Sequence, residues 1–114
     1  MPASVEPPVR FAHSPGGVNH NQLCLTARIA EARPLRYTPA GLPALDLLLE
    51  HESRQQEAAQ ERTVQVSVKA VAFGPVAERL ARQALGSLWT CRGFLAAARG
   101  GKGVVFHIQD IQPD

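Results

Sequence analysis

Two cations and three glycines lie close together near the C-terminal end of the chain, in the segment ARGGKGVVF (residues 98–106). Such residues could form a phosphate-binding loop of a nucleotide enzyme, a flexible hairpin tip, or a basic finger that contacts a large anion. The nucleotide loop is excluded because its motif GxxxxGK[ST] fails: Gly103 follows Lys102, Ala96 occupies the first glycine position, and no helical pattern comes next. A glycine-rich hairpin that carries Arg99 and Lys102 remains.

Other residue types that could do chemistry show no catalytic or metal-binding pattern. The histidines are scattered, at His13, His20, His51 and His107. Glu50 and Glu52 would share a strand face, where a solvated strand end is the simpler interpretation than an acid–base pair. Cys24 and Cys91 have no second ligand at zinc spacing, so both are expected to be small buried thiols. We therefore expect no enzyme, no metal and no cofactor.

Length and charge limit the remaining possibilities. The 114 residues suffice for one domain, and the net charge is only +2, but residues 88–109 contain three cations and no acid. No segment is long enough to span a membrane and no signal peptide is evident, so we expect a cytoplasmic protein with no membrane partner. Residues 1–20 are rich in proline without apolar periodicity and are expected to be a disordered leader; residues 21–114 are expected to form the domain.

Five segments alternate apolar and polar residues as strands do. The segment ALDLLLEHE has residues that favour helix, but its leucines recur every second position, so a strand is predicted. The predicted strands are 22–31, 44–52, 63–73, 88–96 and 103–111. In the last two, Leu95 and Val104 are assigned to the buried face, while His107 is assigned to the outward face.

One helix and two loops complete the pattern. GPVAERLARQALG (residues 74–86) places apolar residues at helical spacing from Ala77 to Leu85, with Pro75 in the first turn and Gly86 as the stop. Residues 33–43 are expected to be a loop with a basic and aromatic side, and residues 53–62 a mobile loop or hairpin tip. Five strands with one helix between the third and fourth predict a mainly β fold, a Greek-key barrel of the oligonucleotide-binding (OB) kind.

From Asn21 onward, the sequence resembles primosomal replication protein N, a family of small dimeric proteins of bacterial replication restart. The resemblance rests on the segments NQLCLTARI, PLRYTPAGLPALDLLLEHES, GSLWTCRGFLA and VVFHIQDI, of which the PxGxP turn followed by Leu-Glu-His-x-Ser is the most specific. It implies a homodimer that binds single-stranded DNA, stimulates the primosomal helicase and acts with other replication restart proteins. It implies no catalytic residues.

The family's binding residues transfer only in part. Arg36 matches a basic position, whereas Tyr37 replaces a lysine and Glu52 an arginine; Gln60 and Gln65 stand where family members can carry aromatic residues. Stacking contributes about 1–3 kcal/mol per base, so its loss should weaken binding and leave it strongly dependent on salt.

The expected DNA contacts are cations of the loops and outward strand faces, together with two rings that could still stack on bases. These residues are Arg28, Arg33, Arg36, Tyr37, Lys69, Arg92, Phe94, Arg99 and Lys102. Simpler interpretations remain open: Arg28 and Lys69 as ordinary outward strand residues, Phe94 as a ring in a dimer interface or beneath a loop, and Arg99 and Lys102 as a solvated tip.

Two other functions remain open. The first is a dimeric adaptor that docks on the restart helicase and contacts DNA only marginally, which the missing aromatic residues favour. The second is a general protector of single-stranded DNA, although such proteins usually carry an acidic flexible tail and this chain ends at QPD, directly after the last predicted strand.

Overall fold

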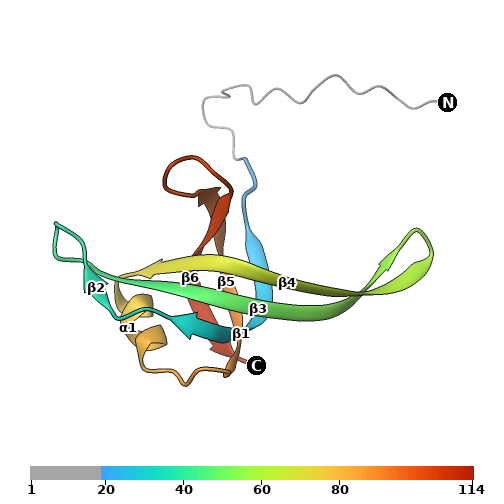
Figure 1. Ribbon diagram of the computed structural model, residues 1–114, viewed down its shortest axis with the longest axis horizontal. Coiled ribbons are helices and arrows are strands. Elements are labelled where there is room, and N and C mark those ends of the chain that lie inside the picture. Colours follow the sequence, from blue (N-terminus) through green and yellow to red (C-terminus); the bar gives the residue numbers. More distant parts are fainter. Residues whose placement is uncertain (1–18) are drawn as a thin grey trace.

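Six strands and one helix make up the described part of the chain, residues 19–114 of the computed structural model (Figure 1). They are β1 (Leu23–Ala32), β2 (Arg36–Tyr37), β3 (Pro43–Glu57), β4 (Gln60–Phe73), α1 (Pro75–Ala81), β5 (Leu88–Ala97) and β6 (Val104–Pro113). Most of the predicted leader lies outside the described residues, so it stays a prediction. Within residues 19–114, no helix is long and apolar enough to cross a membrane.

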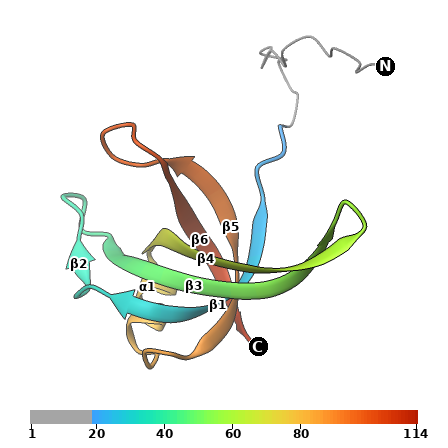
Figure 2. The same cartoon turned by 45° about the vertical axis from the view of Figure 1, so that its right-hand side comes forward.

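The five long strands form a closed barrel in the order β1-β5-β6-β4-β3, and pairing of β1 with β3 closes it (Figure 2). Only β4 and β6 run parallel; β2 adds a short antiparallel pair at the edge of β3. The helix lies between the third and fourth long strands, as predicted, and the five-stranded OB barrel is confirmed. The two-residue β2 was expected to be loop.

The core follows the alternation in the sequence. Leu45, Leu47 and Leu49 all point into the barrel, which confirms that their segment is a strand despite its helix-forming residues. Phe106, Ile108 and Ile111 fill the core from β6, where a register shift relative to β5 moves the alternation by one residue. Leu95 and Val104 were assigned to the buried face, and this is wrong: both are exposed, on the β5–β6 hairpin where it leaves the barrel.

The β3–β4 hairpin is far longer than expected and extends beyond the barrel (Figure 1). Of the two predictions for residues 53–62, the hairpin tip is confirmed and the mobile loop is wrong, because the strands continue to a two-residue turn at Ala58 and Ala59, both with positive φ. The polar residues there have little apolar surface to bury, but they pair across the ladder. Arg54 contacts Glu61 at 3.0 Å, and Arg62 contacts Glu57 at 2.7 Å.

The helix α1 ends four residues earlier than its apolar pattern predicts, so Ala84 and Leu85 are exposed instead of buried. The Gln83 side chain donates to the Arg79 carbonyl, the acceptor that the Gln83 backbone N–H would use in a continuing helix. That N–H bonds Leu80 instead, and Gly86 then donates to Ile29 of β1. Contacts to β1 therefore override the helical period after Ala81.

The two cysteines differ in environment. Cys91 is fully buried, but Cys24 is exposed on β1, so the expectation of two buried thiols is wrong for Cys24. Burial, with a smaller effect of Cys24, raises the pKa of the Cys91 thiol to about 11.

We expect a disulfide reagent at pH 8 to modify one thiol per native chain, because Cys91 is both covered and protonated. The second thiol should react only after unfolding in denaturant. The thiol titration is read by absorbance, with Cys24→Ser as the control that should abolish the fast phase. Two equally fast thiols in the native protein would contradict the buried position of Cys91.

Candidate nucleic-acid interface

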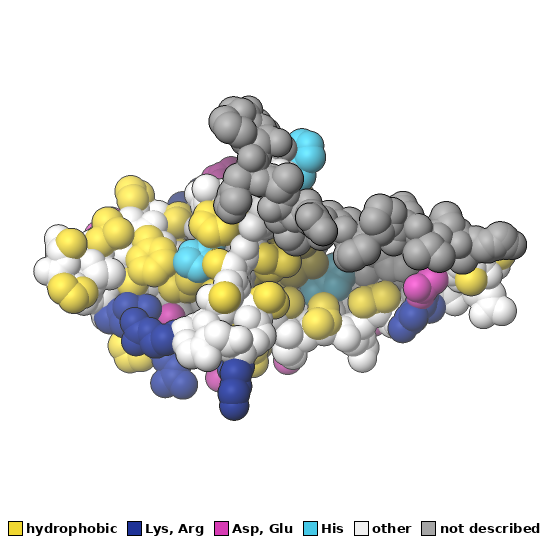
Figure 3. All heavy atoms as spheres, turned by 90° about the horizontal axis from the view of Figure 1, so that it is seen from above, with side chains coloured by type: hydrophobic (Ala, Val, Ile, Leu, Met, Phe, Trp, Pro, Cys, Tyr) yellow, Lys and Arg dark blue, Asp and Glu magenta, His cyan; other side chains and the backbone are white. Residues whose placement is uncertain are grey.

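A groove of about 890 Å³ lies between the β3–β4 part of the barrel and the β5–β6 hairpin, including the start of the β5–β6 loop. Its floor is apolar and includes Leu47, Ala70 and Val71, whereas its sides carry charged and aromatic residues. Figure 3 shows a face of the molecule on which hydrophobic side chains surround a histidine and basic side chains gather at one edge.

Four predicted cations meet in this groove from separate parts of the chain. Arg33 and Arg36 come from the segment between β1 and β3, Lys69 from β4, and Arg99 from the β5–β6 loop. The strand order explains the meeting, since β6 pairs with β4 and brings the β5–β6 loop over the outward face of β4. All four side chains are exposed, so they can reach a bound anion.

Asp46 is the counter-charge within this cluster. It accepts two hydrogen bonds from Arg36, at 2.8 Å from Nε and 3.2 Å from Nη2. This contact lowers the pKa of the Asp46 carboxyl, and the charges of Arg33 and Arg99 lower it further against the opposing effect of burial. Glu31 is the other acid that lines the groove, so the groove has four cations against two acids.

Three rings lie side by side at the same end of the barrel. Phe94 of β5 stacks on His107 of β6 with ring centroids 4.8 Å apart, and Phe73 of β4 lies 5.9 Å from His107. Phe73 and His107 line the groove. Phe94, expected to be a ring that could stack on bases, is partly covered by its stack on His107.

The other predicted contacts lie outside the groove. Tyr37 is 63% exposed on β2, Lys102 lies in the β5–β6 loop, and Arg92 is exposed on β5 opposite Asp110. The loop itself has the expected glycine-rich form, with positive φ at each of its three glycines.

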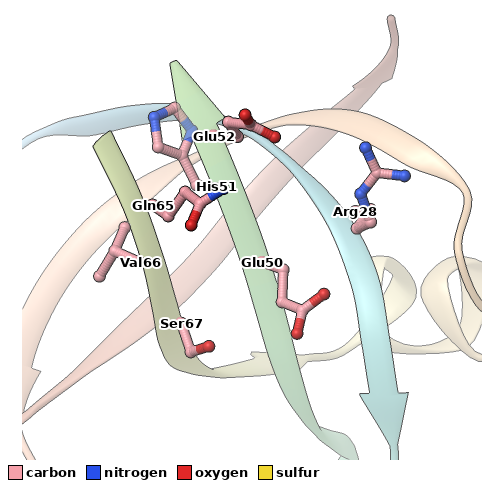
Figure 4. A pocket seen from close by; sticks show the side chains of 7 residues that line it. All are labelled: Arg28, Glu50, His51, Glu52, Gln65, Val66 and Ser67. Carbon is pink, nitrogen blue, oxygen red and sulfur yellow. The ribbon is translucent and has the colours of Figure 1, made fainter. Parts of the chain in front are cut away.

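Arg28 belongs to a separate pocket of about 350 Å³ on the outside of β1, β3 and β4. Figure 4 shows its side chain on β1, with Glu50 and Glu52 on the neighbouring strand β3 and Gln65 beyond them on β4. Two carboxylates near Arg28 disfavour a second anion there. His51, on the other face of β3, bonds the Thr26 carbonyl and Ser53 Oγ.

Sequence reasoning missed Phe73 as a groove residue and set His107 aside as an ordinary outward histidine. A signal was present, because Lys69, Val71 and Phe73 share the outward face of one alternating segment. The sequence alone did not reveal the strand register that places His107 opposite Val71. Within residues 19–114, no group of three or more His, Cys, Asp or Glu side chains could hold a metal ion.

Comparison with known proteins gives consistent matches over the barrel. A model described as "another single-strand binding protein family" matches residues 21–110. The replication restart protein PriB of Bordetella pertussis is 51% identical over 93 residues, covering 81% of this chain and 87% of that protein. The PriB of Neisseria gonorrhoeae is 45% identical, covering 81% and 92%.

Solved structures agree with these matches. The structure of PriB from Ralstonia solanacearum has a TM-score of 0.76 and 39% identity, covering 83% of this chain and 98% of that one. The single-stranded DNA binding protein of Thermus aquaticus has a TM-score of 0.67 and 27% identity, covering 83% of this chain and half of that one. The family model and the PriB relatives each cover most of the chain, which therefore belongs to the single-strand binding protein family and, within it, to the PriB replication restart proteins.

Proposed function

We propose that this protein binds single-stranded DNA in the groove as an accessory protein of replication restart. Its relatives are named replication restart proteins, and a solved protein of the same fold is named as a single-stranded DNA binding protein. The observation that carries the proposal is the meeting of Arg33, Arg36, Lys69 and Arg99 around an apolar groove.

The groove suits a polymer that has charged and apolar sides. The four cations would contact successive phosphates, while the apolar floor and the rings would face the bases. Arg36 is partly neutralised by Asp46, so Arg33, Lys69 and Arg99 should contribute most of the attraction. Gln60 and Gln65 offer no ring on the β3–β4 hairpin, so affinity should depend strongly on salt.

The wider role follows from the family and stays part of the proposal. The protein would act by binding, without catalysis, in the cytoplasm, as a homodimer that works with the primosomal helicase and other restart proteins. A free strand edge supports the dimer: β1 pairs with β5 over Leu23–Arg28 but with β3 only from Arg28 onward. In the described residues, the first half of β1 therefore has one open edge that a second copy could use.

The function is tested by fluorescence anisotropy of labelled oligo-dT at two salt concentrations, with duplex DNA as the comparison. We expect tighter binding to oligo-dT than to the duplex. Arg99→Ala should weaken binding several-fold and reduce the salt slope by about 0.7, the value for one lost single-strand phosphate contact. Lys102→Ala, which removes a cation of the same loop that does not line the groove, is the matched control and should have the smaller effect.

Undetectable binding of the wild type at low salt would reject the DNA-binding proposal and favour the helicase adaptor. If Lys102→Ala lowered the affinity for oligo-dT more than Arg99→Ala did, the protein would still bind DNA, but the groove would be rejected as the binding site.

A further inference from the structure

An aromatic face remains open inside the groove, next to the cations. Phe73 is 37% exposed although it is a large apolar side chain, and it lines the groove together with His107. A single exposed phenylalanine needs no explanation. This one, however, lies beside a second ring, in a concave site that also holds Lys69 of the same strand face.

The three rings are held in a fixed order by the sheet. Phe94 and His107 are directly opposite each other in the β5–β6 ladder, and their rings are nearly parallel, with 13° between their planes. On the other side of β6, His107 pairs in register with Val71 of β4, so Phe73 lies two residues further along. Its ring is tilted by 30° to His107. Phe94 does not line the groove, so it supports His107 from the side away from it.

Nucleobases and phosphates bind different kinds of side chain, and β4 contributes both kinds to the groove. Bases stack on aromatic rings whatever their identity, while phosphates contact cations. Lys69 and Phe73 are four positions apart on one face of β4, which corresponds to roughly 13 Å at 3.3 Å per residue. A strand of DNA lying along β4 could therefore place a phosphate at Lys69 and a base at Phe73.

We propose that Phe73 and His107 form a base-stacking platform at the end of β4 and β6, with Phe94 as the positioning residue that holds the His107 ring. This inference rests on the proposed single-stranded DNA binding. It assigns the stacking to the C-terminal end of β4, in the barrel, and not to the end of β4 in the β3–β4 hairpin. It gives the chain a ring contact with bases that Gln60 and Gln65 on the hairpin do not provide.

A ladder of rings could instead only stabilise the sheet, since cross-strand aromatic pairs do so. The two roles differ in what they require of the ligand. A stacking platform requires bases, whereas a structural ladder would affect any ligand of the groove alike.

The test compares two ligands of equal length, oligo-dT and an abasic oligonucleotide that has the phosphates but no bases. Phe73→Leu keeps apolar volume but removes the ring. We expect it to weaken oligo-dT binding by about five-fold or more, as for one lost stacking contact, and abasic binding by less than about two-fold. Leu85→Ala, which removes an apolar side chain that is 65% exposed and does not line the groove, is the control and should leave the oligo-dT affinity near that of the wild type.

Several results would overturn the inference. Unchanged oligo-dT affinity in Phe73→Leu would reject the platform while leaving DNA binding intact, and an equal loss on both ligands would assign Phe73 to the shape of the groove. Wild type that binds neither ligand would reject the proposed function itself. His107 has its own pair of variants: His107→Phe should retain the oligo-dT affinity that His107→Ala lowers, and equal affinities would remove His107 from the platform.

Phe73→Trp gives a second readout should Phe73→Leu fail to fold. Stacking on a base should quench the emission of the added indole when oligo-dT binds, relative to the wild type, whose single tryptophan, Trp89, does not line the groove. No extra quenching by oligo-dT, at saturating binding, would overturn the proposal.

Discussion

Replacing Arg33, Lys69 and Arg99 together with alanine is expected to lower the affinity for oligo-dT about a hundred-fold at low salt, at about 1 kcal/mol for each lost charge contact. These three cations line the groove, and no salt bridge within the described residues engages them. The slope of log K against log salt should become shallower by about 2, because each single-strand phosphate contact contributes about 0.7. Anisotropy titrations at four salt concentrations measure both quantities.

Net charge alone could also weaken DNA binding, so the control must change it equally. Arg54, Arg62 and Arg82 are exposed cations that do not line the groove, and their joint replacement with alanine removes the same three charges. Circular dichroism would confirm that both variants are folded. An equal loss of affinity and slope in the two triple variants would show that binding follows overall charge and has no preference for the groove.

Gly93→Ala is expected to destabilise the barrel by about 3 kcal/mol, near the upper end of the range for an overpacked core. A Cβ at this position would overlap the carbonyl oxygen of His107, lie 2.8 Å from its carbonyl carbon and 3.0 Å from the Phe106 ring. The obstructing atoms are mostly backbone of β6, which pairs on both sides, so neither strand can move away freely. Thermal unfolding should show a Tm lower by more than about 10 °C.

Gly101→Ala separates this steric effect from the general cost of replacing glycine. Gly101 has a φ of 77°, but an added methyl group would meet no other part of the chain within 4 Å, so only backbone strain of about 1 kcal/mol is expected. Gly93→Ala should also disturb DNA binding through His107, whereas Gly101→Ala should not. Similar Tm values for the two variants would contradict the close approach of β5 and β6 at Gly93.

The barrel was predictable because its strands are long enough for alternation to dominate over propensity. The leucines at 45, 47 and 49 each point inward, and the short helix begins at the predicted Pro75. The length of the strands over residues 53–62 was not, because this segment has no apolar face from which to predict them, and its side chains make polar contacts across the ladder, such as Arg54 with Glu61. The end of α1 was missed for a related reason, since Gly86 bonds Ile29 across the fold.

The candidate site was predictable as a set of cations but not as a place. Arg33, Arg36, Lys69 and Arg99 were all identified from the sequence, yet so was Arg28, which the structure puts beside Glu50 in another pocket. Whether a cation lies in the groove or in the other pocket depends on which strands are neighbours. The same holds for Phe73 and His107, whose rings approach only because β4 and β6 run parallel at their point of pairing.

Because Asp46 already contacts Arg36, its carboxylate would compete with the phosphates of a bound nucleic acid for that side chain. Asp46 presents two oxygens to the guanidinium as a phosphate would, so it holds the Arg36 side chain in place and partly neutralises its charge. A phosphate must compete with that carboxylate, whereas small anions at low concentration gain little by doing so. For the DNA ligand proposed above, the pair would lower the affinity of Arg36 for a single phosphate and would favour a multivalent strand that also engages the neighbouring cations.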